Sequence, residues 1–468
     1  MKYLAFLPEV IVGLLALACL AAGPAGPVRL GSRGRRAVPV WVSVGLLLAL
    51  LLELTLGATV FGGPYVQDRL ALFGKGATLL ALLLAVAVTD WDLEGVAALG
   101  WRPLGVTLVG ALGVMAVASA AGYAGLWIGL ALALLAPAFS VALGEPAALR
   151  GRLLTSAAGS LLLTLAGLLV IFVATGQAGF ASTAHSLSGH VAPISVAIGV
   201  LLVAGGLGVA LVAAPWGLAA RRSVSPFALG AGFGLVALGA GLGLVKVTGA
   251  AVVSFPGWAP GLQLAAAVAI VAGAFGALSA SRLSRLLGWV GVVQVGWFLA
   301  ALSTHQRAGI GGGLFALAAL AVAGAVAPQL IAASESGLGL PGLGARQPWR
   351  AAALIGSLLS LAGAPPLVGF FAEFAIGSSL ARSGGFWVLA VGLMATILTL
   401  AATVRVIRRL FLDGSSEELR RPVPAEVTLP ALAVTGAWVT AVMMAGWGLL
   451  ANPTFDLAVQ GAAAVGFR

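Results

Sequence analysis

Five ionisable side chains fall inside or at the edge of long apolar stretches of this sequence of 468 residues: Glu9, Glu53, Lys75, Lys246 and Glu373. Charge is costly in such surroundings, and a carboxyl group there favours its protonated form. Two such groups of opposite sign can relieve the cost by pairing, whereas a single carboxyl group can store and release a proton. The chemistry that these residue types offer is therefore ion pairing and proton transfer.

Other chemistries find little support in the sequence. The chain has one cysteine, Cys19, which lies in an apolar run, and three histidines (His185, His190 and His305), none at the spacing of metal ligands. There is no CxxC pair, and no Gly-rich phosphate loop follows a strand-like segment. We therefore expect no metal, flavin, haem, iron–sulfur or nucleotide site on this chain.

The elements that must position these side chains are membrane helices. The sequence is 61% hydrophobic and 8% charged, with a mean hydropathy of +1.11. This composition excludes a soluble globular enzyme, a disordered chain and a fibrous protein. It predicts an all-α polytopic membrane protein with about 14 transmembrane helices, near 5–23, 39–60, 70–89, 102–119, 122–143, 153–175, 191–214, 227–247, 263–280, 286–303, 312–333, 351–381, 386–403 and 427–450. Glu9 interrupts the first stretch, which favours a retained helix over a cleaved signal peptide.

The basic residues predict an orientation. Of the 25 lysines and arginines, 18 fall in alternate loops, five on the other side, and two, Lys75 and Lys246, within spans. The positive-inside rule then places the arginine-rich loops in the cytoplasm and both termini outside the plasma membrane. The net charge of +11 is thus explained by topology, with no need for a nucleic-acid partner.

Prolines in the middle of two spans suggest an internal repeat. Pro215 falls in the seventh span, and Pro365 with Pro366 in the twelfth. Broken helices at matching places are typical of transporters built from inverted repeats. Spans 4–8 and 9–13 would form two inverted five-helix repeats, giving the divisions 1–101, 102–250, 251–410 and 411–468. Two unrelated kinks explain the prolines equally well.

The charged residues receive separate interpretations. Glu53 and Lys75 both lie about 10 Å or less below the outer surface at 1.5 Å per helical residue, so we expect a structural ion pair. Lys246 lies near the outer end of the eighth span and, like Glu53 and Lys75, is a candidate for a structural ion pair or a proton path. Glu373 follows the proline pair deep in the twelfth span and is the candidate proton carrier. The alternative for Glu373 is a neutral acid bonded to carbonyls that Pro365 and Pro366 leave free.

Several segments resemble the antiporter-like membrane subunits of respiratory complex I, and in particular its subunit N. The start LPEV, the segment FGGPYVQDRLALFGK with Asp68 and Lys75, and above all LSLAGAPPLVGFFAEF carry the resemblance. It extends over essentially the whole chain, and its pieces occur in the same order.

The resemblance implies a role without redox chemistry. Such a subunit of bacterial NADH–quinone oxidoreductase couples quinone reduction elsewhere in the complex to proton movement. NADH, FMN, iron–sulfur clusters and quinone would be bound by partner subunits. The implied neighbours are the antiporter-like subunit M, the small core membrane subunits and membrane lipid.

The sequence departs from the family at the residues that carry charge. The resemblance places the usual span-five glutamate at Ala131, the span-seven lysine at about Ala210 and a span-eight lysine near Val236. Gln294 stands for the span-ten histidine, whereas the span-twelve position stays ionisable as Glu373. We therefore expect an N-terminal half that no longer conducts protons by the family route.

Three alternative functions stay open at this point. The chain could serve a cation–proton antiporter complex or a membrane hydrogenase, to which the same family contributes. It could be a stand-alone secondary transporter, which would need polar residues converging at mid-membrane. It could also be a structural subunit that pumps nothing.

Overall fold

A computed structural model describes residues 5–22, 26–56, 63, 65–91, 100–143, 145–187, 193–220, 225–251, 258–335, 343–411 and 431–467. In these ranges the regular secondary structure is helical, apart from two isolated β-bridges. The helices are α1 (Leu7–Ala22), α2 (Gly26–Leu56), α3 (Arg69–Val88), α5 (Arg102–Ser119), α6 (Tyr123–Ala142), α7 (Ala147–Thr175), α8 (Phe180–Leu187), α9 (Pro193–Ala220), α10 (Pro226–Ala251), α11 (Ala259–Ser279), α12 (Leu283–Leu302), α13 (Arg307–Glu335), α14 (Leu343–Arg346), α15 (Pro348–Leu361), α16 (Val368–Arg382), α17 (Phe386–Phe411), α19 (Ala431–Leu449) and α20 (Ala451–Ala464).

The helices confirm an all-α polytopic membrane protein. Twelve of those described are long and apolar enough to cross a membrane. Each of the spans expected from the sequence coincides with helical residues. Two differ from the expectation: α1 is shorter than the expected first span, and the twelfth span is divided between α15 and α16. α20 was not expected from the sequence. It packs on α13 and α3, and its mixture of small, polar and apolar residues has no long hydrophobic run.

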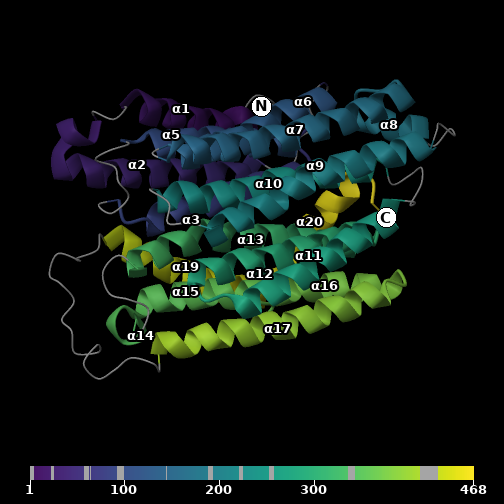
Figure 1. The fold of residues 1–468 in the computed structure, drawn as a ribbon. Coiled ribbons are helices and arrows are strands. Elements are labelled where there is room, and N and C mark those ends of the chain that lie inside the picture. Colours follow the sequence, from purple (N-terminus) through teal and green to yellow (C-terminus); the bar gives the residue numbers. More distant parts are fainter. Residues whose placement is uncertain are drawn as a thin grey trace.

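The helices lie roughly side by side in one elongated bundle (Figure 1). α1, α6 and α7 lie along one edge and α17 along the other, with α10, α13 and α12 between them. α13 is the central helix: its apolar window is buried throughout, and it packs against α10, α16, α12, α3 and α20. Burial on all sides explains why α13 is apolar around its whole circumference.

The order of neighbouring helices recurs along the chain. α5 packs along α6 and α7 along α9, with α10 returning to α5; α11 packs along α12 and α13 along α16, with α17 returning to α11. This order fits two five-helix units in spans 4–8 and 9–13. Whether the units are inverted copies stays a prediction.

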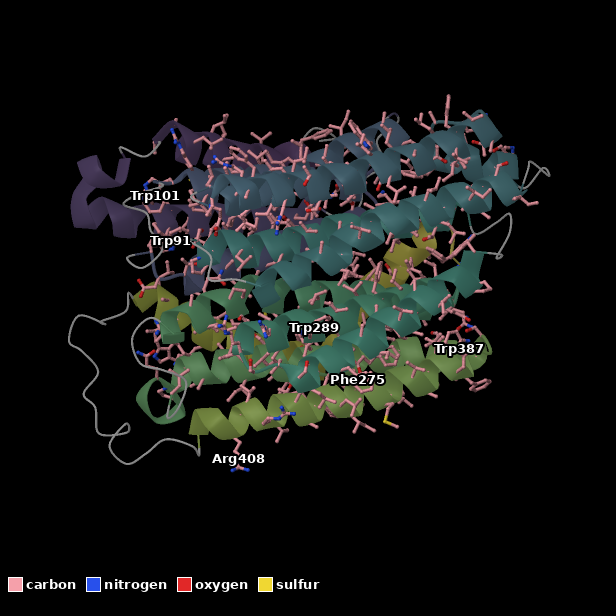
Figure 2. The ribbon with its side chains drawn as sticks, viewed as in Figure 1. Trp91, Trp101, Phe275, Trp289, Trp387 and Arg408 are labelled. Atoms are coloured by element: carbon pink, nitrogen blue, oxygen red, sulfur yellow. The ribbon has the colours of Figure 1, made fainter. Side chains whose placement is uncertain are left out.

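The two ends of the bundle carry different connections. Tyr65 pairs with Ala120, and Gly122 pairs with Gly179. The connections that contain these residues therefore meet at one end of the bundle, which we call the Tyr65 end. Trp91 and Trp101 lie together at the opposite end, their rings 5.6 Å apart, and Trp387 lies towards the Tyr65 end (Figure 2). We call the opposite end the Trp101 end. Trp91 and Trp101 are buried, whereas Trp387 is exposed, as is typical of tryptophan at a membrane interface.

The two predicted helix breaks have different outcomes. α15 ends at Leu361 and α16 begins at Val368, so the break at Pro365 and Pro366 is confirmed. α9 runs unbroken through Pro215, and the break expected there is wrong. A single proline removes one helical hydrogen bond, which a helix can absorb as a kink, whereas two consecutive prolines after a glycine stop it.

Glycine 369 lets the two halves of the broken helix approach closely. A Cβ atom at this position would collide with the carbonyl oxygen of Ser360, which belongs to the last turn of α15. We expect Gly369→Ala to lower the free energy of unfolding by about 3 kcal/mol, because backbone atoms cannot move aside as a side chain can. Thermal unfolding of the purified chain measures this loss. Gly159→Ala is the matched control, since nothing lies within 4 Å of a Cβ there, and equal melting temperatures for the two variants would contradict the prediction.

Candidate functional site

Glu373 lies where the broken helix restarts. It belongs to the second turn of α16, and its side chain packs against Gly363, whose φ of +73° turns the chain between α15 and α16. A Cβ at Gly363 would collide with the Glu373 carboxyl group, so glycine is required both by φ and by space. The residue is 8% exposed. The turn after Leu361 therefore forms one wall of the Glu373 site.

Two neutral donors hold the carboxyl group. The side-chain amide of Gln294 on α12 donates to Oε1 over 2.7 Å, and the Thr396 hydroxyl on α17 donates to Oε2 over 2.7 Å. The same Gln294 amide also donates to the Leu361 carbonyl over 2.6 Å, at the end of α15. Four helices therefore meet at Glu373, and among the described residues no cation lies within 4.0 Å of it. The carboxyl group can gain a proton without breaking an ion pair.

A line of hydroxyl groups leads away from Glu373 along α17. Thr396, Thr399 and Thr403 recur at helical spacing on one face, and the last two are 1% and 0% exposed. The hydroxyl of Thr403 has no hydrogen-bond partner within the described part of the chain. Beyond Thr403, a small cavity between Arg282 and Arg405 opens at the Trp101 end. These hydroxyl groups are spaced along α17 between the carboxyl group and the Trp101 end, and the Thr399 hydroxyl donates to carbonyls of its own helix.

The second buried cluster joins α1, α2 and α3. Lys75 is 0% exposed and forms an ion pair with Glu9. It also donates to Tyr65 and, over 2.6 Å, to the side-chain carbonyl of Gln67, whose amide donates to Glu53. The predicted direct pair of Lys75 with Glu53 is therefore wrong. Glu9 takes that place, and the Gln67 amide bridges Lys75 to Glu53.

Tyr65 completes this cluster. Its hydroxyl donates to Glu9 over 2.8 Å, and its ring lies 4.8 Å from the Lys75 ammonium group. Burial, and after it the Glu9 carboxylate, raise the pKa of Tyr65, so the phenol keeps its proton at neutral pH. The sequence did not single out Tyr65 or Gln67, because both lie in an irregular segment where no periodicity indicates which side chains turn inward.

Lys246 lies next to this cluster without joining it. Its ammonium group donates to the Ala120 carbonyl over 3.0 Å and lies 5.9 Å from the Phe180 ring. The side chain is 3% exposed, and no carboxylate among the described residues lies within 4.0 Å. A carbonyl and a ring face each offer partial negative charge to the cation. Lys246 thus has partners, but none of them is an ion.

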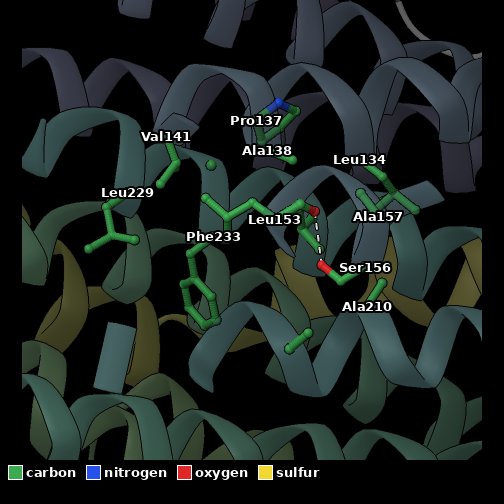
Figure 3. A pocket seen from close by; sticks show the side chains of 13 residues that line it. Leu134, Pro137, Ala138, Val141, Leu153, Ser156, Ala157, Ala210, Leu229 and Phe233 are labelled. Carbon is green, nitrogen blue, oxygen red and sulfur yellow. Dashed lines mark hydrogen bonds between the residues drawn. The ribbon is translucent and has the colours of Figure 1, made fainter. Parts of the chain in front are cut away.

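The N-terminal half contains an apolar cavity. It lies between α6, α7, α9 and α10 and has a volume of about 640 Å³ including its open mouth (Figure 3). Ala210 and Val236, where the family resemblance places lysines, both line it. Within the described part of the lining, Ser156 alone has a polar side chain. Its hydroxyl donates to the Leu153 carbonyl of its own helix over 2.9 Å. Among the described residues that line the cavity, none has a side chain that could store a charge.

Comparison with known proteins bears directly on this arrangement. Residues 124–399 match the family described as NADH:quinone oxidoreductase/Mrp antiporter, TM. NADH-quinone oxidoreductase subunit N of Parvibaculum lavamentivorans is 26% identical to this chain over 91% of each sequence. The relative of the same name from Rhodobacter capsulatus is 27% identical over 94% of this chain and 95% of its own length.

A solved structure of known function has a similar fold. A chain of respiratory complex I from Thermus thermophilus superposes with a TM-score of 0.73 at 21% identity, covering 97% of this chain and 99% of its own. The family match and the relatives confirm the resemblance that the sequence motifs indicated. The superposition extends the likeness to the arrangement of the helices.

Proposed function

The chain belongs to the NADH:quinone oxidoreductase/Mrp antiporter transmembrane family, and we propose that it is subunit N in the membrane arm of a bacterial NADH–quinone oxidoreductase, respiratory complex I. The likeness to curated subunit N proteins over about nine-tenths of both sequences carries the proposal. The chain would sit in the plasma membrane beside subunit M and the small core membrane subunits. Its Trp101 end would face the cytoplasm.

In this role the chain carries out no redox step. NADH, FMN, iron–sulfur clusters and quinone are bound by partner subunits, and the reduction of quinone there drives proton movement here. Around Glu373 the buried polar groups are a carboxyl, an amide and a hydroxyl group, and of these the carboxyl group can bind and release a proton. The chain's own contribution is therefore to hold a proton at Glu373 and release it.

The two halves of the chain have unequal roles in this proposal. The C-terminal unit has a carboxyl group that can be protonated without losing an ion partner, with a route of threonine hydroxyls towards the Trp101 end. The N-terminal unit has Ala131, Ala210 and Val236 where charges would be needed. We propose that proton movement through this chain uses the C-terminal unit alone, and that the N-terminal unit is structural.

Purification of the assembly tests the proposed membership. A tagged copy of the chain, purified from its own cells in mild detergent, is expected to bring NADH- and quinone-reducing subunits with it in fixed ratio, as measured by mass spectrometry. A tagged membrane protein of unrelated family, purified in parallel, controls for carry-over. If the chain elutes intact and alone, it is a stand-alone transporter. Companions of an antiporter or hydrogenase assembly would assign it to that complex.

A further inference from the structure

The apolar cavity between α6, α7, α9 and α10 opens sideways, towards the surroundings of the bundle. Ser156 of α7 and Ala213 of α9 line the cavity and are both exposed, whereas Leu134 and Phe233 form its buried wall. The mouth therefore lies between α7 and α9 on the lateral surface. In a membrane-spanning chain, this surface faces lipid or a neighbouring subunit.

The lining of the cavity selects an apolar occupant. Its residues are aliphatic, glycine, proline and Phe233, apart from Ser156, whose hydroxyl donates within its own helix. A buried water needs two to four polar partners, which such a lining does not supply. The enclosed space is about 100 Å³, within a hollow of about 640 Å³ that includes the open mouth, so it has room for a thin chain and not for a bulky ligand. A flexible hydrocarbon chain fits both the shape and the chemistry.

The charges beside the mouth indicate what the hydrocarbon is attached to. Arg150 and Arg152 are exposed in the first turns of α7, just before Leu153, Ser156 and Ala157 of the lining. Arg150 lies one turn before Leu153 on the same helix face. With Glu145 in the preceding connection, this rim has a net charge of +1. Exposed arginines next to the membrane attract anionic headgroups.

We propose that this cavity binds one acyl chain of an anionic phospholipid, whose phosphate lies at Arg150 and Arg152. The acyl chain enters between α7 and α9 and covers Ala210 and Val236. A membrane supplies this ligand at high local concentration, and the small residues Ala157, Ala210 and Gly232 provide the space for it. The bound chain excludes water from the place where a charged side chain is missing. The proposal of a lipid site requires that the chain lie in a membrane, and it does not require that the chain belong to complex I.

Photocrosslinking in a bilayer tests the site. The purified assembly is placed in phosphatidylcholine nanodiscs that contain phosphatidylglycerol with a diazirine at the end of one acyl chain. After irradiation, mass spectrometry maps the labelled peptides. We expect labelling to concentrate on the lining segments of α6, α9 and α10, and to weaken when unlabelled phosphatidylglycerol competes. Uniform labelling of all exposed helices would overturn the proposal.

Two variants make the test specific. Ala157→Trp fills the half-buried part of the cavity and is expected to remove most of the labelling of Ala210 and Val236 peptides. Leu162→Trp is the matched control on the same helix: Leu162 is 65% exposed and does not line the cavity, so labelling there should persist. Equal labelling in the two variants would contradict an acyl chain as the occupant.

The headgroup is tested separately, with a change that leaves the cavity intact. Arg150→Gln is expected to lower the preference for phosphatidylglycerol over phosphatidylcholine by roughly fivefold, the effect of one basic residue near a membrane surface. Arg285→Gln, an exposed arginine in the first turn of α12, is the control. An unchanged preference in Arg150→Gln would exclude a specific anionic headgroup. Co-purification of the redox subunits, read from the same samples, keeps this outcome distinct from failure of the proposed function.

Discussion

Replacing Glu373 with glutamine is expected to reduce proton transfer through this chain by about 100-fold or more, because glutamine cannot bind and release a proton at neutral pH. The fold should survive the change. The new side-chain carbonyl can accept from Gln294, and the new amide can donate to Thr396, the two groups that hold Glu373 over 2.7 Å each. The measurement is the number of protons moved per quinone reduced by the complex in vesicles, together with the rate of quinone reduction.

The expected result is a lower proton yield with electron transfer largely retained. Glu373→Asp is the conservative control, since it keeps an ionisable group at the same helix position and should preserve part of the yield. Thr396→Val, which removes one donor, tests whether the hydroxyl positions the carboxyl group without carrying the proton itself. A proton yield in Glu373→Gln equal to that of the unmodified complex would mean that this carboxyl group is a buried neutral acid with a structural role.

The helices were predicted well from the sequence because each one corresponds to a long run of apolar residues. Each span needs about twenty apolar residues, and the runs survive an error of a few residues at either end. The helix break at Pro365 and Pro366 was also predictable, since two prolines remove two backbone donors, and the nearby Gly363 can adopt a positive φ. Pro215 was misjudged because one proline alone does not tell whether a helix kinks or ends.

Side-chain partners were less predictable than helices. The depth of a residue in the membrane can be estimated from the sequence, and Glu53 and Lys75 were expected at similar depths. The rotation of each helix about its axis cannot be predicted in this way, and the rotation in the structure brings Lys75 into contact with Glu9 instead. The Gln67 bridge depends on an irregular segment for which the sequence gives no period. Gln294, by contrast, was located by its place in a family motif, and the structure brings it into contact with Glu373.

Loss of the Lys75 ammonium group is expected to have the largest effect on stability. Lys75→Met would leave Glu9 without its ion partner and would remove the donors to Tyr65 and Gln67 at the same time. Removing one member of a buried pair costs about 3–5 kcal/mol, because the remaining charge is then uncompensated. The free energy of unfolding of the purified chain, obtained from denaturant titration in detergent micelles, measures the loss.

Two further variants distinguish the effect of losing the ion pair from the effect of replacing a buried lysine. Lys246→Met removes a lysine that is 3% exposed and whose ammonium group, among the described residues, donates to a carbonyl and lies over a ring. The loss of unfolding free energy should therefore be smaller, about 1.5–3 kcal/mol. In the double variant Glu9→Gln with Lys75→Met, no charge of the pair remains. A buried pair replaced as a whole by neutral groups is often close to neutral in stability, so the double variant should recover much of the loss. If it is instead as unstable as the sum of its single changes, Glu9 and Lys75 stabilise the junction of α1, α2 and α3 independently, and their contact is not an energetic pair.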